Sequence, residues 1–200
     1  MEFSRNNLTE GGAETSIEAR NQKIRSDLGA GMLPVLPFER IVIARQIAKV
    51  KEEQDEMGRE LGEVNHQGSE TWHDNFAANN IQRNSVVVSR RGSKLAETEV
   101  NTVEYDYPPH GEEITVGSFL EIRFRDAADT MQVILTGFAK DPGESADLLP
   151  VPAGVTFVTL KSPLGTALLG AKPGEAVSYA VNGRPMEVQV LSVSQLQPTQ

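Results

Sequence analysis

The chain has 200 residues, of which 38% are hydrophobic, 24% charged and 6% aromatic, enough for one ordinary domain or two small units. Its net charge of −9 argues against direct binding of DNA or RNA through the phosphate backbone, which needs a positively charged surface. The absence of cysteine excludes disulfides, zinc ribbons and thiol catalysis, and no segment has the length of a membrane span or the apolar core of a signal peptide. We therefore expect a soluble cytoplasmic protein with no membrane contact and no direct sequence-specific DNA binding.

Residues 1–34 mix glycine, asparagine, serine and charged residues with little periodicity. Such a composition is typical of a flexible segment, so we predict a largely flexible N-terminal arm. One short helix around residues 16–28 fits within this arm. Pro34 and Pro37 mark its end, and the sequence pattern changes sharply there.

Two long helical segments follow the arm. In the first, predicted over about residues 37–65, apolar positions alternate in steps of four and three, as in a heptad seam. The seam breaks at residues 66–69 and resumes beyond Asp74. Two matched helices and a short polar turn predict an antiparallel coiled-coil hairpin over residues 35–101 with its tip at residues 66–75, and one long amphipathic helix is the alternative. The seam positions are Ile43, Ile47, Val50, Gln54, Met57, Leu61 and Val64, then Ala77, Ile81, Asn84, Val88, Arg91, Leu95 and Thr98.

The far end of this hairpin is strongly acidic. Between Glu52 and Asn75 the sequence has eight acidic residues against Arg59 alone, whereas the rest of residues 35–100 is net positive. Because the chain as a whole is also negative, we expect any role on nucleic acid to be exerted through another protein.

Strand patterns begin after a linker that we place at residues 102–113. Five apolar or alternating runs predict strands, and Asn182-Gly183 supplies the positive-φ turn of a closing hairpin. The sequence therefore predicts an antiparallel β domain with one short helix over residues 114–196, and an α+β fold class for the whole chain. The predicted strands are residues 119–124, 131–138, 156–160, 176–181 and 185–194, and the short helix is residues 163–170.

The short helix contains the most specific motif of the chain, which reads K-S-P-L-G-T-A-L-L-G-A-K-P-G-E over residues 161–175. Ser162 can cap the helix, Pro163 suits its first position and Gly170 can end it. Leu164, Leu168 and Leu169 form one apolar face. Packing therefore accounts for most of the role of these leucines.

The same stretch resembles the signature S-P-L-G-x-A-L-L-G-x-x-x-G-D/E of the Gre transcript-cleavage factors of bacterial RNA polymerase. Val116-Gly117-Ser118 and Gly183 also match that family, so the resemblance is strong over residues 114–195 and weak over residues 38–100. It implies a C-terminal domain with a fold like that of FK506-binding prolyl isomerases (FKBP-like), which docks at the rim of the polymerase secondary channel. The partner-binding residues that it implies are Ser162, Pro163, Leu164, Gly165, Leu168 and Gly170.

The tip departs from the Gre pattern. Gre factors carry G-D-L-S-E-N-A-E-Y-H-A-A there, with acids that help to hold a second Mg²⁺ in the polymerase active centre, whereas residues 68–78 here read G-S-E-T-W-H-D-N-F-A-A. Neither possible alignment transfers both acids. Glu70 and Asp74 are four residues apart and can present two carboxylates to a Mg²⁺ held mainly by the polymerase. Asp74 has the alternative role of capping the second helix.

Trp72 and His73 lie between these two acids in the sequence. An exposed tryptophan at a hairpin tip indicates a contact with a partner or a base. His73 can serve as an acid or base near neutral pH or be a solvated loop histidine, and we group it with Trp72 as a partner-binding residue. The resemblance thus predicts a factor that reaches the RNA 3′ end through RNA polymerase and stimulates the polymerase's own cleavage of backtracked RNA, without being an enzyme itself. A non-cleaving regulator of the same channel and an FKBP-like peptide-binding adaptor are the alternatives.

Overall fold

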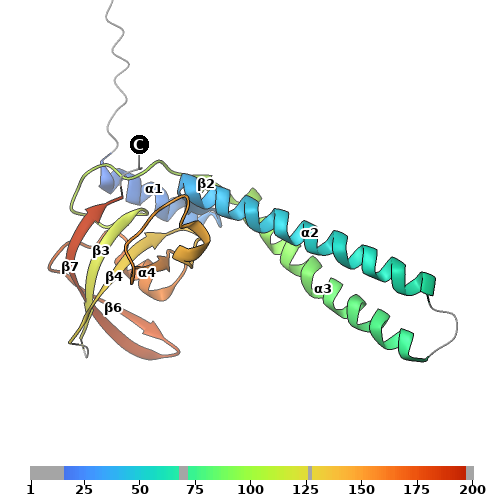
Figure 1. Ribbon diagram of the computed structural model, residues 1–200. Coiled ribbons are helices and arrows are strands. Elements are labelled where there is room, and N and C mark those ends of the chain that lie inside the picture. Colours follow the sequence, from blue (N-terminus) through green and yellow to red (C-terminus); the bar gives the residue numbers. More distant parts are fainter. Residues whose placement is uncertain (1–15, 68–71, 126–127, 197–200) are drawn as a thin grey trace, which may run out of the picture.

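A computed structural model describes residues 16–67, 72–125 and 128–196 of the chain. It combines α-helices with a curled β-sheet, and two long helices project side by side away from the sheet (Figure 1). In chain order the elements are α1 (Ile17–Gly29), β1 (Leu33–Val35), α2 (Pro37–Gln67), α3 (Trp72–Val100), β2 (Thr102–Glu104), β3 (Ser118–Phe124), β4 (Thr130–Thr136), the 3₁₀ helix η1 (Pro142–Ser145), β5 (Thr156–Thr159), α4 (Pro163–Leu168), β6 (Ala176–Val181) and β7 (Arg184–Gln195).

The two long helices lie where the heptad pattern predicted them. They run antiparallel, since residues 53 and 54 of α2 contact residues 91 and 89 of α3. Three seam residues, Val50, Val88 and Leu95, are buried between them. A Cβ atom added at Gly92 would lie 3.1 Å from Val50 Cγ1, so this glycine allows the close approach of the two helices despite its low helix propensity.

Charge is divided between the two long helices. Residues 52–63 of α2 carry six acids and Arg59, whereas the facing residues 80–94 of α3 carry four basic residues and no acid. Within the described part of the chain, the ion pair of Glu53 with Arg91 is the one that joins the two helices. Over these residues the helix pair is therefore acidic along α2 and basic along α3.

The main sheet has five strands in the order β5-β4-β3-β7-β6. The predicted strands and short helix are all present, and Asn182 and Gly183 have the expected positive φ angles of 50° and 78°. The prediction of a purely antiparallel sheet is wrong, because β5 pairs parallel to β4. Residues 137–155, which contain η1, return the chain to the starting end of β4 before β5 begins, and a parallel pair needs such a crossover.

Residues 16–34 also differ from the predicted flexible arm. The short helix expected near residues 16–28 is present as α1, with Ser16 as its cap, but it packs against the sheet domain. Ile24 is fully buried in the main core and Asn21 Nδ2 donates to the carbonyl oxygen of Ile114 at 3.1 Å. The segment is fixed because its few apolar residues meet one face of the domain, a contact that has no periodic signal in so short a stretch. The other residues of the predicted arm, 1–15, lie outside the described residues.

The main hydrophobic core crosses the domain limits predicted from the sequence. Leu36, directly before α2, and Phe38 and Val42 in its first two turns join the same buried cluster as the sheet. The ring centroid of Phe38 lies 6.2 Å from that of Phe157. The short strands β1 and β2, which precede α2 and follow α3, pair in parallel. The base of the helix pair is therefore built into the sheet domain.

Candidate functional site

The residues predicted to act at the tip lie around the start of α3, and Glu70 falls outside the described residues. Trp72, His73 and Asp74 are the first three residues of α3, so the prediction that Asp74 caps this helix is wrong. A cap residue precedes the first helical turn, whereas Asp74 lies inside that turn. No cluster of three or more potential metal ligands occurs among the residues that the structure describes.

The S-P-L-G motif forms α4 as predicted. Ser162 Oγ accepts a hydrogen bond from Gly165 N at 3.0 Å and donates to Thr159 O at 2.7 Å, and Pro163 occupies the first turn. A Cβ atom added at Gly165 would lie 2.1 Å from Thr159 O, so only glycine fits there. Leu168 is fully buried. The structure thus explains Gly165 and Leu168 by packing.

The other motif residues are more accessible. Pro163 is exposed, and Ser162, Leu164 and Gly170 are half-buried. Gly170 has φ +86° and donates its N–H to Ile114 O at 2.8 Å, which joins the end of α4 to the segment before β3. Among the predicted partner-binding residues of α4, the surface is therefore formed by Pro163 with parts of its neighbours.

Helix α1 adds a contact that the sequence did not predict. Arg25 Nη2 donates to Leu169 O at 2.9 Å, directly beside Gly170. Because C-terminal carbonyl groups of a helix have no partner within it, a guanidinium group from another element can satisfy one of them. Helix α1 therefore covers the end of α4.

Sequence reasoning also missed Glu39, which lies in the first turn of α2 and has no exposed surface. Its Oε1 accepts hydrogen bonds from Phe138 N at 2.6 Å and Ala139 N at 2.8 Å. Its Oε2 accepts from Leu36 N at 2.8 Å and Gly137 N at 3.1 Å. One side chain thus satisfies four backbone N–H groups and joins the start of α2 to the loop after β4.

Two opposing effects act on the Glu39 carboxyl. Burial raises its pKa, and the four backbone hydrogen bonds act in the opposite direction because they favour the ionised form. The contact with Leu36 could be predicted from the sequence, because a glutamate at the third position of a helix can accept a hydrogen bond from the N–H of the preceding cap residue, as in a capping box. The contact with residues 137–139, about 100 positions away, has no local signature.

Two surface contacts join α2 to the segment around η1. Arg45 Nη1 and Nη2 donate to Asp147 Oδ1 and Oδ2 at 2.9 and 2.6 Å, and Gln46 Nε2 donates to Glu144 Oε2 at 2.9 Å. The hydrogen bond from Arg45 lowers the pKa of Asp147, and the same bond raises the pKa of Arg45. These contacts lie at the base of the helix pair, beyond Glu39 along α2.

The Arg45→Ala variant is expected to raise the pKa of the Asp147 carboxyl toward its ordinary value of 3.8. Because the pKa of Asp147 is lowered in the folded protein, the stabilisation from this pair is complete above the unfolded pKa and is lost as the pH falls through the folded pKa. A titration of the Asp147 carboxyl by nuclear magnetic resonance measures the change. Arg59→Ala, an exposed arginine elsewhere on α2, is the control, and an Asp147 titration that is equal in both variants would contradict the assignment.

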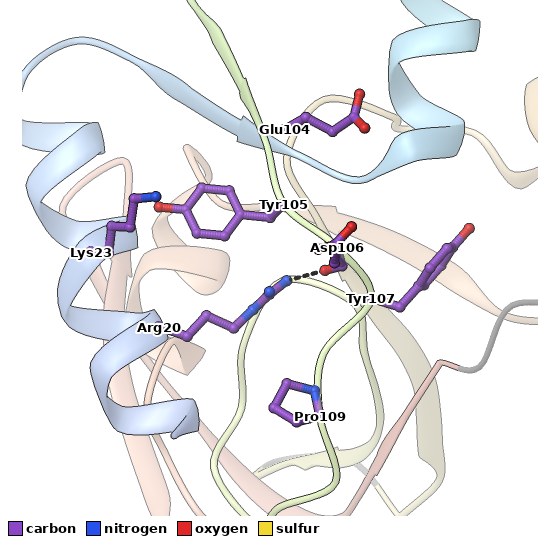
Figure 2. A pocket seen from close by; sticks show the side chains of 7 residues that line it. All are labelled: Arg20, Lys23, Glu104, Tyr105, Asp106, Tyr107 and Pro109. Carbon is purple, nitrogen blue, oxygen red and sulfur yellow. Dashed lines mark hydrogen bonds between the residues drawn. The ribbon is translucent and has the colours of Figure 1, made fainter. Parts of the chain in front are cut away.

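A cleft of about 380 Å³ lies between α1 and the segment 104–109 (Figure 2). Two cations lie near the Tyr105 ring, with Arg20 Cζ 5.1 Å and Lys23 Nζ 5.3 Å from its centroid. Arg20 Nη2 donates to Asp106 O at 2.6 Å, and the Tyr105 hydroxyl donates to Asp27 Oδ2 at 2.6 Å. Burial lowers the pKa of Arg20 and raises that of Tyr105. The polar groups of this cleft hold α1 against the chain that leaves α3.

No helix in the described part of the chain is long and apolar enough to cross a membrane.

In a comparison of whole sequences, the uncharacterised protein Rv3788 of Mycobacterium tuberculosis (strain ATCC 25618 / H37Rv) is 29% identical over 153 residues, which cover 76% of this chain and 87% of that protein. Mb3817 of Mycobacterium bovis has the same identity and coverage. These relatives carry no stated activity.

Solved structures of transcription factors are also similar. Gfh1 of Thermus aquaticus matches with a TM-score of 0.36 and 17% identity, covering 81% of this chain and 97% of Gfh1. The elongation factor GreA/GreB of Nitrosomonas europaea matches with a TM-score of 0.30 and 17% identity, covering 56% and 92%. Residues 149–195, which include β5, α4, β6 and β7, match the C-terminal family of the transcription elongation factors GreA and GreB. The Gre resemblance predicted from residues 161–175 is thus confirmed, because residues 149–195 match the C-terminal family model of the transcription elongation factors GreA and GreB.

Proposed function

We propose that this chain is an accessory factor of bacterial RNA polymerase that stimulates the polymerase to cleave backtracked RNA. The observation that carries the proposal is the family match over residues 149–195, in a chain that also bears a projecting pair of antiparallel helices. In the proposed arrangement the helix pair is a coiled-coil hairpin, the sheet domain is FKBP-like, and the factor is not itself an enzyme.

In this proposal the sheet domain docks at the rim of the polymerase secondary channel. Pro163 is exposed and Leu164 is half-buried on α4, so these side chains are available to a partner. The helix pair then enters the channel. With 31 residues, α2 is about 46 Å long, which allows its far end to act at a distance from the docking surface.

At the far end, Glu70 and Asp74 would supply carboxylate oxygens, and Trp72 and His73 would contact the polymerase or the RNA 3′ end. Two carboxylates are too few for a complete metal site, but they suit an ion whose other ligands come from the polymerase and the RNA phosphates. Such a Mg²⁺ ion activates water and stabilises the leaving oxygen of a phosphodiester. The chain's own contribution would be to supply two carboxylate ligands to this ion beside the reacting phosphodiester.

A second candidate function is occupation of the same channel without cleavage, which slows or retunes transcription. It is favoured by the tip sequence, in which neither alignment with the Gre pattern places acids at both family positions. It is also favoured by the place of Asp74, which is held inside α3 and not in the connection between the helices.

One assay separates these functions. When the protein is added to halted, backtracked elongation complexes, we expect RNA shortened at its 3′ end, and about 10-fold to 100-fold slower shortening with Glu70→Ala or Asp74→Ala, as for the loss of a group that supports a metal. Glu56→Ala, an exposed acid farther down α2, is the control and should leave the rate unchanged. Binding and slowing without shortened RNA would support the second function, and no binding to polymerase would contradict both.

A further inference from the structure

The start of α2 is joined to the sheet domain by the apolar packing of Phe38 and Val42 and by a small number of polar contacts, and the polar contacts are the directional ones. The deepest of them is the buried carboxylate of Glu39, which accepts from Gly137, Phe138 and Ala139 of the sheet domain. The loop that donates these hydrogen bonds is itself held in place. Thr136 Oγ1 donates to Ala139 O at 2.7 Å, and a Cβ atom at Gly137 would lie 1.8 Å from Pro34 O.

The remaining polar contacts at the base of α2 are weaker. Arg40 with Thr102 and Glu104, Arg45 with Asp147, and Gln46 with Glu144 are exposed, and an exposed ion pair or hydrogen bond is screened and competes with water. A buried carboxylate with four N–H donors cannot exchange its partners for water without opening the core. Among these polar contacts, Glu39 is therefore the one most able to fix a single direction for α2.

The direction of α2 matters because the helix is a long lever. With a length of about 46 Å, a tilt of about 10° at its first turn moves its far end by about 8 Å. Errors of about 1 Å in the position of reacting groups already lower rates strongly. A docked domain with a loosely held helix pair would therefore bind its partner but place the tip badly.

We propose that Glu39 is a positioning residue, whose carboxylate holds the helix pair at one orientation to the sheet domain and thereby places the tip after docking. The proposal rests on the proposed function for its consequence at the polymerase, but not for the orientation itself. It assigns to Glu39 no contact with RNA, metal or polymerase.

The orientation can be measured on the protein alone. Because the chain has no cysteine, spin labels can be attached at Glu60→Cys on α2 and Ser178→Cys on β6, both exposed positions. Pulsed electron paramagnetic resonance should give one narrow distance distribution for the otherwise unchanged protein. Glu39→Gln should broaden or shift this distribution, while the control Glu53→Gln, on the same helix, should not.

The consequence is then measured with polymerase. For Glu39→Gln we expect a Kd for polymerase within about twofold of that of the unchanged protein. At saturating concentration, we expect its effect on the polymerase, whether cleavage or slowing, to be about tenfold smaller. A role limited to stability would change neither the distance in the folded protein nor the effect at saturation. Glu39→Asp, which keeps the charge but shortens the side chain by one methylene, is a second variant if Glu39→Gln does not fold.

The proposal is overturned if the distance distribution stays unchanged in a folded Glu39 variant. It is also overturned if the distribution broadens while cleavage or slowing at saturating concentration keeps its full size. It is also overturned if Arg45→Ala with Gln46→Ala broadens the distribution as much as Glu39→Gln, since the surface contacts would then set the orientation. If the unchanged protein does not bind polymerase, the proposed function fails, and the distance measurements still decide whether Glu39 sets the orientation.

Discussion

The Glu39→Gln variant should unfold with a free energy about 3 kcal/mol lower than that of the unchanged protein. Each carboxylate oxygen of Glu39 accepts from two backbone N–H groups. A glutamine keeps one such oxygen but puts an NH₂ group, which cannot accept, in the place of the other. Two buried N–H groups then lose their acceptor, at a cost of about 1–3 kcal/mol each. Chemical denaturation in urea followed by circular dichroism measures the change.

The Glu53→Gln variant is the matched control for this prediction. Glu53 is also a glutamate of α2, but its carboxylate is partly exposed and pairs with Arg91 across the helix pair. We expect a change of about 0.2–1 kcal/mol there, because exposed ion pairs contribute little. Equal losses in the two variants would contradict the role given to burial and to the four N–H donors of Glu39.

The Gly165→Ala variant is expected to lower the free energy of unfolding by about 3 kcal/mol. The new methyl group would lie 2.1 Å from the carbonyl oxygen of Thr159, which is backbone and cannot turn away. Helix α4 would have to move off β5, and the hydrogen bond from Gly165 N to Ser162 Oγ would be distorted. Thermal unfolding followed by circular dichroism gives the shift in Tm.

Gly58→Ala tests whether this effect comes from the crowding at Gly165 or from glycine replacement in general. Gly58 lies in α2 with nothing within 4 Å of an added Cβ atom. Alanine there should raise the free energy of unfolding by about 0.5–1 kcal/mol, because it favours the helix. A stabilising Gly165→Ala would show that the short approach of α4 to Thr159 does not exist in solution.

Local patterns predicted the elements that form by local rules. The heptad spacing predicted both long helices, and Asn182-Gly183 predicted the turn between β6 and β7. Both predictions succeed because helical periodicity and turn preference depend on residues that are close in sequence. The S-P-L-G motif likewise predicted the cap at Ser162. Features that depend on residues far apart in sequence were missed, namely the parallel pairing of β5 with β4 and the packing of α1.

The candidate site was predicted less completely than the fold. Pro163 and Leu164 lie accessible on α4, but Gly165 and Leu168, which were grouped with them as partner-binding residues, are buried. The sequence shows which residues share a motif, and it does not separate those that pack from those that face solvent within a single turn. Glu39 escaped prediction because three of its four donors belong to a loop about 100 residues later.

The division of charge between α2 and α3 gives the helix pair an electric dipole across its long axis. Six acids along residues 52–63 of one helix face four bases along residues 80–94 of the other. A rod with such a dipole experiences a torque in the electric field of a charged partner. It therefore prefers one rotation about its own axis before any close contact forms. Salt at physiological concentration limits this guidance to separations of about 8 Å. The dipole would therefore orient the helix pair about its long axis only after the pair has come close to the charges of a partner, and not while the protein is free in solution.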